Sequence, residues 1–178
     1  DFCVAEAARK LGHTCDYKKY LDRSHQWVNM WNPDLESRGF KGFICPKTID
    51  GKWIPIDATY FWGSWKRYFY EADAWTYSFF MPHDIDRLVE LCGGKEAFAK
   101  KLDYGFRNSL LELANEPSFL ATRLFNHVGR MDLTCYWVNY VMENLFGEYS
   151  MPGNDDSGAM SSWWLFSAMG FFPNAGQN

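Results

Sequence analysis

The chain has 178 residues, enough for one domain, and its charge is mild, because 18 Lys and Arg side chains oppose 22 Asp and Glu to give −4. Without a basic stripe, binding to a nucleic-acid backbone is excluded. No apolar run approaches the ~20 residues that a membrane-spanning helix needs. Five cysteines lack C-x-x-C spacing, which excludes a zinc ribbon. Aromatic residues, 19% of the chain, fit a helical core and rings that stack on sugars.

Helical periodicity accounts for most of the chain. We expect helices at about 1–11, 16–31, 74–80, 85–91, 95–102, 117–128, 132–146 and 157–169. Gly12 and Pro33 end the first two, and Asp84 is expected to cap the helix that starts at Ile85. Paired helices with alternating short and long loops predict an all-α fold, an α/α toroid, in which the long loops gather at one end and form the site.

Residues 32–70 form the longest predicted connection. We expect a short hairpin around the Asp50–Gly51 turn, with Phe43–Ile44 and Trp53–Ile54 as its strands. All β structure should be confined to this region. Because the chain begins in an amphipathic helix and ends in a loop, we interpret 1–178 as one part of a longer protein.

The run from Pro152 to Trp164 is the most informative motif. It places Asn154, Asp155 and Asp156 between two glycines, directly before a helix rich in small residues and tryptophan. A helix N-terminus stabilises the ionised form of a carboxylate, which suits a general base or a metal ligand. One Asp could simply cap the helix, but a cap requires neither the second Asp nor the flanking glycines.

A second acidic position, Glu71, lies among the rings of the segment 68–77. An acid in an apolar setting is disfavoured in its charged form, so it can stay protonated and donate to a leaving group. A solvated Glu at a helix start is an equal alternative.

The third position is Glu116, which Pro117 holds extended, next to Asn115. It could bind a sugar hydroxyl or a cation, or it could cap the following helix.

Together these motifs resemble glycoside hydrolase family 92, the calcium-dependent exo-α-mannosidases. The resemblance runs along the whole chain. It is carried by Arg23-Ser-His-Gln-Trp27, Tyr70-Glu71-Ala-Asp-Ala-Trp75-Thr-Tyr77, Pro82-His83-Asp84, Asn115-Glu116-Pro117-Ser118 and Gly153-Asn-Asp-Asp156-Ser-Gly158, the last followed by Met160-Ser-Ser-Trp163 and Ala168-Met-Gly170-Phe-Phe-Pro173.

The family resemblance implies the fold and activity of the whole protein. The chain would be most of a C-terminal (α/α)6 catalytic barrel, with an N-terminal β-sandwich and the end of the barrel supplied from outside residues 1–178. The barrel would hydrolyse terminal α-mannosides of oligosaccharides or glycoprotein glycans with inversion, assisted by Ca²⁺. A secreted or periplasmic location is also implied. This part alone could be inert.

The resemblance also assigns residue roles. Glu71 is the general acid, Asp156 the general base, and Asp155 supports it. Glu116, Asn115, Trp75 and Asn154 are expected to bind substrate, and Glu116 and Asn115 to bind the metal. Inversion requires a water between base and sugar, so the two carboxyl groups should stand ~6.5–9.5 Å apart.

Two positions depart from the family pattern. Ala72-Asp73 follows the acid where Gly-Asn is common, and Asn115 stands where some α-1,2-specific members have His. Glu rather than Gln at position 71 argues against cleavage of mannosyl phosphates. The alternatives are another (α/α)6 glycosidase, which would need neither calcium nor the 153–158 loop, and an inert mannan-binding homologue, against which both Asp residues and Glu71 count.

Overall fold

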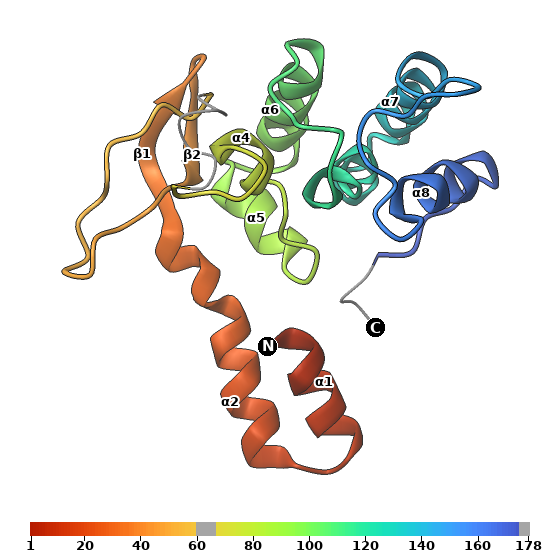
Figure 1. Ribbon diagram of the computed structural model, residues 1–178. Helices are drawn as coiled ribbons and strands as arrows, with labels where there is room; N and C mark the ends of the chain where they lie inside the picture. Colours follow the sequence, from red (N-terminus) through yellow and green to blue (C-terminus); the bar gives the residue numbers. More distant parts are fainter. Residues whose placement is uncertain (60–66, 175–178) are drawn as a thin grey trace.

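The computed structural model describes residues 1–59 and 67–174, and Figure 1 shows how its elements are arranged. The chain begins with a helical hairpin of α1 (Phe2–Lys10) and α2 (Thr14–Ser24), which pack against each other. In Figure 1 this hairpin projects from the remaining elements. The predicted long second helix is wrong beyond Ser24, because the chain tightens into the 3-10 segment η1 (His25–Met30) and then becomes extended.

A two-stranded antiparallel sheet follows, formed by β1 (Trp31–Ser37) and β2 (Phe40–Ile44). Arg38 and Gly39 connect the strands with φ angles of 54° and 81°, the left-handed conformation of a tight hairpin turn. The pairing expected for Phe43–Ile44 is wrong, since these residues pair with Trp31 and Asn32. The turn at Asp50–Gly51 does form, with a single antiparallel bridge between Lys47 and Trp53.

The rest of the described chain is mainly helical, as expected. Its elements are α4 (Ala74–Tyr77), α5 (Ile85–Leu91), α6 (Lys95–Arg107), η2 (Glu116–Ser118), η3 (Ala121–Val128), α7 (Met131–Asn144) and α8 (Ala159–Ala168). α6 extends beyond the predicted end at Leu102, because Gly105 and Phe106 continue its buried face. The 117–128 helix is instead the two 3-10 segments η2 and η3. α6 and α7 both pack on η3, and α8 packs on α7. Closure of the helices into a toroid stays a prediction.

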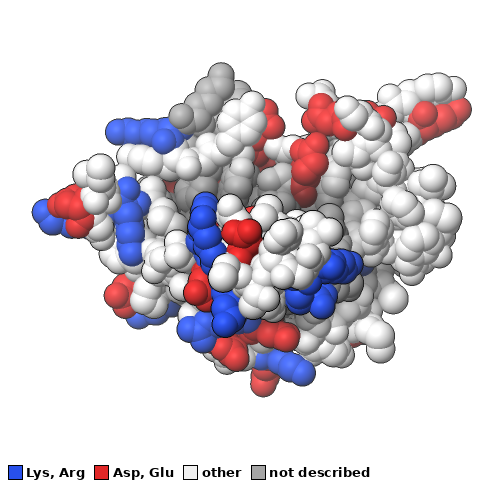
Figure 2. Space-filling view, turned by 90° about the horizontal axis from the view of Figure 1, so that it is seen from below, with Lys and Arg blue, Asp and Glu red and all other residues white. Residues whose placement is uncertain are grey.

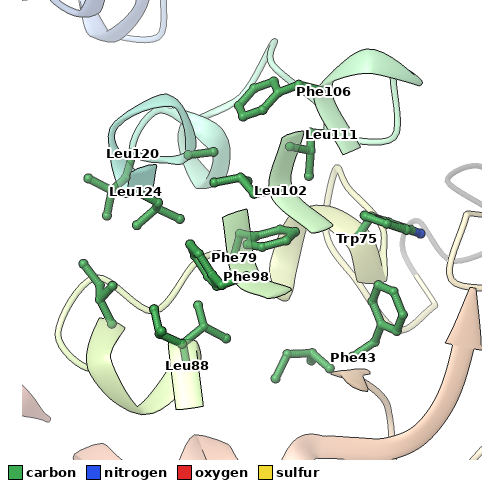
Figure 3. Packing of buried hydrophobic residues seen from close by; sticks show 14 of the residues in the cluster. Phe43, Trp75, Phe79, Leu88, Phe98, Leu102, Phe106, Leu111, Leu120 and Leu124 are labelled. Atoms are coloured by element: carbon green, nitrogen blue, oxygen red, sulfur yellow. The ribbon is translucent and has the colours of Figure 1, made fainter. Parts of the chain in front are cut away.

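One hydrophobic core joins the sheet to α4, α5, α6 and η3 (Figure 3). Trp75 and Phe43 lie at its sheet end, with ring centroids 5.0 Å apart. Lys101 enters the same region with 3% of its surface exposed. Its Nζ donates to the carbonyl of Gly42 and lies over the Phe43 ring, and burial lowers the pKa of the amine to about 8. This contact attaches α6 to β2.

In the part of the chain that the structure describes, no helix combines the length and apolarity that crossing a membrane requires. Basic and acidic side chains are interspersed on the face shown in Figure 2. This distribution agrees with the absence of a basic stripe in the sequence.

Candidate active site

The predicted acid, Glu71, lies just before a helix whose start is firmly capped. The carboxylate of Asp73 accepts a hydrogen bond from the Thr76 backbone N–H at 3.0 Å, the usual geometry of an N-cap. Asp73 is 6% exposed, and burial raises the pKa of its carboxyl to about 6. The extra acid near Glu71 is therefore a buried capping group of α4.

The backbone of Glu71 has φ 52°, in the left-handed region that a residue with a side chain seldom adopts. The Tyr77 hydroxyl donates to the carbonyl of the preceding residue, Tyr70, at 2.8 Å. Burial raises the pKa of the Tyr77 phenol, and the neighbouring Glu71 carboxylate adds to this shift. The left-handed conformation of Glu71 costs about 1–3 kcal/mol and persists only where surrounding contacts enforce it. The structure thus holds Glu71 in a strained and fixed position.

Asn115 connects Glu71 to a second segment. Its Nδ2 donates to Oε2 of Glu71 at 2.8 Å, while its Oδ1 accepts from the Glu116 backbone N–H at 3.1 Å. The segment itself is attached to α4, because the Glu112 backbone N–H donates to Oγ1 of Thr76 at 2.9 Å. Two of the three predicted acidic motifs are therefore in direct contact.

The third motif, the 153–158 loop, packs against the same segment. A Cβ atom on Gly153 would lie 2.2 Å from the backbone oxygen of Ala114, which is the neighbour of Asn115. Only glycine permits this approach. The loop containing Asn154, Asp155 and Asp156 therefore begins beside the segment that contacts Glu71.

Asp155 and Asp156 have different surroundings within the loop. Asp155 accepts from the backbone N–H and from the hydroxyl of Ser161, both at 2.8 Å, and the backbone hydrogen bond lowers the pKa of its carboxyl. Asp155 therefore anchors the start of α8, and its supporting role in catalysis stays a prediction. Asp156 is exposed, with φ 37°, and the left-handed backbone continues through Ser157 and Gly158.

The predicted substrate contact of Trp75 is not supported. Its side chain is fully buried, and its indole N–H donates to Oγ of Ser37 at 3.0 Å. A ring without exposed surface cannot stack on a sugar, so Trp75 belongs to the core that supports α4. The sequence placed it correctly near Glu71 but could not show which way the ring points.

A cavity of about 370 Å³ lies beside Glu116 and is mainly apolar. Phe80, Phe119, Trp163, Phe166 and Phe172 contribute rings to it. Its lining includes Glu116 but neither Glu71 nor Asp156. Asn154 and Glu116 are exposed.

The described residues contain no group of three His, Cys, Asp or Glu side chains placed to hold a metal ion. The Asn115 side chain, one of the predicted ligands, has both its polar atoms engaged by Glu71 and Glu116. Calcium binding by this chain therefore stays a prediction, and Glu116 offers an exposed carboxylate for it.

Sequence reasoning missed the role of Asp84. This residue precedes α5 as predicted, but its side chain makes no capping hydrogen bond. It accepts instead from Nε1 of Trp27 at 2.8 Å, and Nδ1 of His25 lies 3.0 Å from the same oxygen. The Arg23–Trp27 and Pro82–Asp84 motifs thus form one contact that fastens η1 to α5. The hydrogen bonds of Thr76 with Glu112 and of Tyr77 with Tyr70 were not predicted either, although Thr76 and Tyr77 lie within the motif around Glu71.

Comparison with known proteins adds family information to this geometry. The model of the glycosyl hydrolase family 92 catalytic domain matches residues 1–178. A protein of Arthroderma benhamiae described as an uncharacterized secreted glycosidase is 37% identical over an alignment of 194 positions, which covers 100% of this chain and 25% of that protein.

Solved structures of this family are similar as well. A family 92 α-mannosidase from Bacteroides thetaiotaomicron, solved with mannoimidazole, is 25% identical with a TM-score of 0.81, over 98% of this chain and 25% of that one. An inverting family 92 mannosidase from the same organism is 28% identical with a TM-score of 0.83, over 98% and 26%. The chain spans about a quarter of the length of these relatives.

Proposed function

Because this chain belongs to glycosyl hydrolase family 92, we propose that the intact protein removes terminal, non-reducing α-linked mannose from mannosides or N-glycans. Residues 1–178 would supply both catalytic carboxylates. The observation that carries this proposal is the cluster in which Asn115 contacts Glu71 and the neighbouring Ala114 contacts Gly153. The cluster joins the segment of the proposed acid to the loop of the proposed base.

In this mechanism, Glu71 transfers its proton to the glycosidic oxygen while the bond between that oxygen and C1 of mannose breaks. Asp156 accepts a proton from a water molecule that attacks C1 from the opposite face, so the product is β-mannose. The exposure of Asp156 supports this role, because the base must reach a water molecule. Asp155 holds the loop at the start of α8 through Ser161.

We also propose that the helices described here form part of an (α/α)6 barrel, which the rest of the protein completes. Two family 92 mannosidase structures match this chain over 98% of its length, which supports the proposal. An extracytoplasmic location is proposed because the Arthroderma benhamiae relative is described as secreted.

Calcium assistance remains a proposal for the intact protein only. Glu116 is exposed and would offer one carboxylate ligand, and the other oxygen ligands would come from outside the described residues. We expect exhaustive EDTA treatment to abolish mannosidase activity and added Ca²⁺ to restore it. Full activity of the metal-free protein would remove calcium from the proposal without affecting the two carboxylate roles.

The proposed acid is tested by comparing two substrates. General acid assistance contributes about 10²–10⁴-fold to rate, so Glu71→Gln should lower turnover of a mannobiose by this factor. An activated aryl mannoside, whose leaving group departs without a proton, should be slowed much less. NMR should detect the β-anomer of mannose first. Equal slowing of both substrates, or prior appearance of the α-anomer, would refute the mechanism.

A further inference from the structure

We propose that Asn115 is a positioning residue for the general acid, which confines the acidic proton of Glu71 to Oε1 and fixes the direction of its carboxyl group. The inference rests on the proposed function of Glu71. It gives Asn115 a role different from binding substrate or metal.

The orientation of the Asn115 carboxamide follows from its two hydrogen bonds. The Glu116 backbone N–H can only donate, so the atom of Asn115 that lies 3.1 Å from it must be the oxygen. The amide nitrogen therefore faces Glu71, with Nδ2 at 2.8 Å from Oε2. This nitrogen can only donate, so Oε2 of Glu71 must act as an acceptor.

In a protonated carboxyl the O–H oxygen is the donor, and the carbonyl oxygen is the stronger of the two acceptors. Because Oε2 accepts from Asn115, the form of Glu71 with its proton on Oε1 is favoured. A proton on Oε2 would lie toward the N–H of Asn115 and would not be directed at the glycosidic oxygen. The hydrogen bond thus determines which oxygen of Glu71 donates.

The segment that carries Asn115 is attached to α4, the helix that begins three residues after Glu71. The Glu112 N–H donates to the side chain of Thr76 on α4, and the Ala114 N–H donates to the carboxylate of Glu112 at 2.9 Å. Thr76 is 2% exposed, and its hydrogen bond with Glu112 is half-buried. Donor and acceptor are therefore mounted on one rigid unit, as positioning requires.

Two substitutions in the intact protein test this role. Asn115→Ala removes the donor. Asn115→Asp keeps the size and the bond from Glu116, but places an acceptor against Oε2, so the acidic proton is drawn between the two carboxyl groups. We expect kcat on a mannobiose to fall about 10- to 100-fold in both variants, with KM nearly unchanged. An activated aryl mannoside should lose less than about threefold.

Asn144→Ala provides a matched control. Nδ2 of Asn144 on α7 donates to the Tyr140 carbonyl, also at 2.8 Å, in an exposed position. This control should leave both substrates unaffected. If Asn115→Ala lowers the melting temperature, the equal-sized Asn115→Asp variant still reports on the donor.

A double-mutant cycle separates this inference from the proposed function. When Glu71 is already Gln, adding Asn115→Ala should cost little further activity, since its effect passes through Glu71. Additive losses, equal loss on both substrates, or no loss at all would overturn the positioning role while Glu71→Gln still behaves as an acid variant. If Glu71→Gln itself slows both substrates equally, the proposed function fails instead.

Discussion

The two candidate catalytic carboxylates occupy contrasting parts of the molecule. Glu71 belongs to a segment that includes the buried Trp75 and the buried Asp73, which caps α4. Asn115 contacts the Glu71 side chain. Asp156 lies exposed in a loop with left-handed backbone, which depends on the close approach of Gly153 to Ala114. The Glu71 segment is therefore built into the core, whereas the loop with Asp156 lies on the surface of the molecule.

This difference matches what the two roles require. A general acid must keep a proton and direct it at one oxygen atom, so its carboxyl needs fixed partners. A general base must be ionised and must reach water, so exposure suits it. The contrast therefore predicts that substitutions on the two sides have effects of different kinds.

The largest expected effect follows Asp156→Asn. Because water must be activated whichever group leaves, turnover of a mannobiose and of an aryl mannoside should both fall, by about 10²–10⁴-fold. Steady-state kinetics of the intact protein with both substrates measure this. Asp155→Asn is the comparison within the loop, since it affects the contact with Ser161 and should reduce activity less. A larger loss in Asp155→Asn than in Asp156→Asn would reverse the two roles.

The next effect concerns attachment of the loop. Gly153→Ala places a methyl group 2.2 Å from the Ala114 oxygen, so backbone must move. We expect a loss of stability of about 3 kcal/mol and slower turnover of both substrates. Thermal unfolding and kinetics measure these changes.

Gly51→Ala serves as the control, because a Cβ there meets nothing within 4 Å although φ is 83°. That variant should lose only the cost of the left-handed conformation, about 1–2 kcal/mol, and retain activity. Unchanged stability in Gly153→Ala would show that the loop does not depend on its contact with Ala114.

Local features of the site were predictable from the sequence. The glycine-flanked acids were predicted to precede a helix, and they lie directly before α8. The extended conformation predicted for Glu116 is wrong, because the 3-10 segment η2 begins at this residue. Whole helices with regular periodicity, such as α5, were also predicted with the correct bounds. Local propensity and capping decide these features.

Features that depend on tertiary contacts could not be predicted. Phe43 and Ile44 satisfy a strand pattern with either neighbour, and the Arg38–Gly39 turn selected Trp31 and Asn32 as partners. Trp75 was predicted to bind substrate, but the burial of its ring depends on residues far along the chain. The hydrogen bond between Asn115 and Glu71 spans 44 residues, so no local pattern announces it.

The smallest predicted effect concerns the core side of the comparison. Asp73 has a native pKa of about 6, above its usual value of 3.8, chiefly because burial disfavours its charged form. Between about pH 4 and 6 the native state therefore keeps a proton that the unfolded state has released. Stability contributed by this group is present at low pH and is lost as the pH rises through this window.

Asp73→Asn removes the titration and keeps an oxygen that can accept from Thr76. The variant should match the parent near pH 4 and exceed it by on the order of 2 kcal/mol at pH 8, as measured by thermal unfolding of the intact protein across this range. Asp57→Asn is the opposite case, because hydrogen bonds from Thr59 lower the pKa of Asp57. That variant should be less stable than the parent at pH 8, and the difference should shrink at low pH. An Asp73→Asn variant that is less stable than the parent at pH 8 would mean that the buried carboxylate is needed in its charged form. Burial would then not be the main influence on the Glu71 segment, and the comparison with the exposed Asp156 loop would fail.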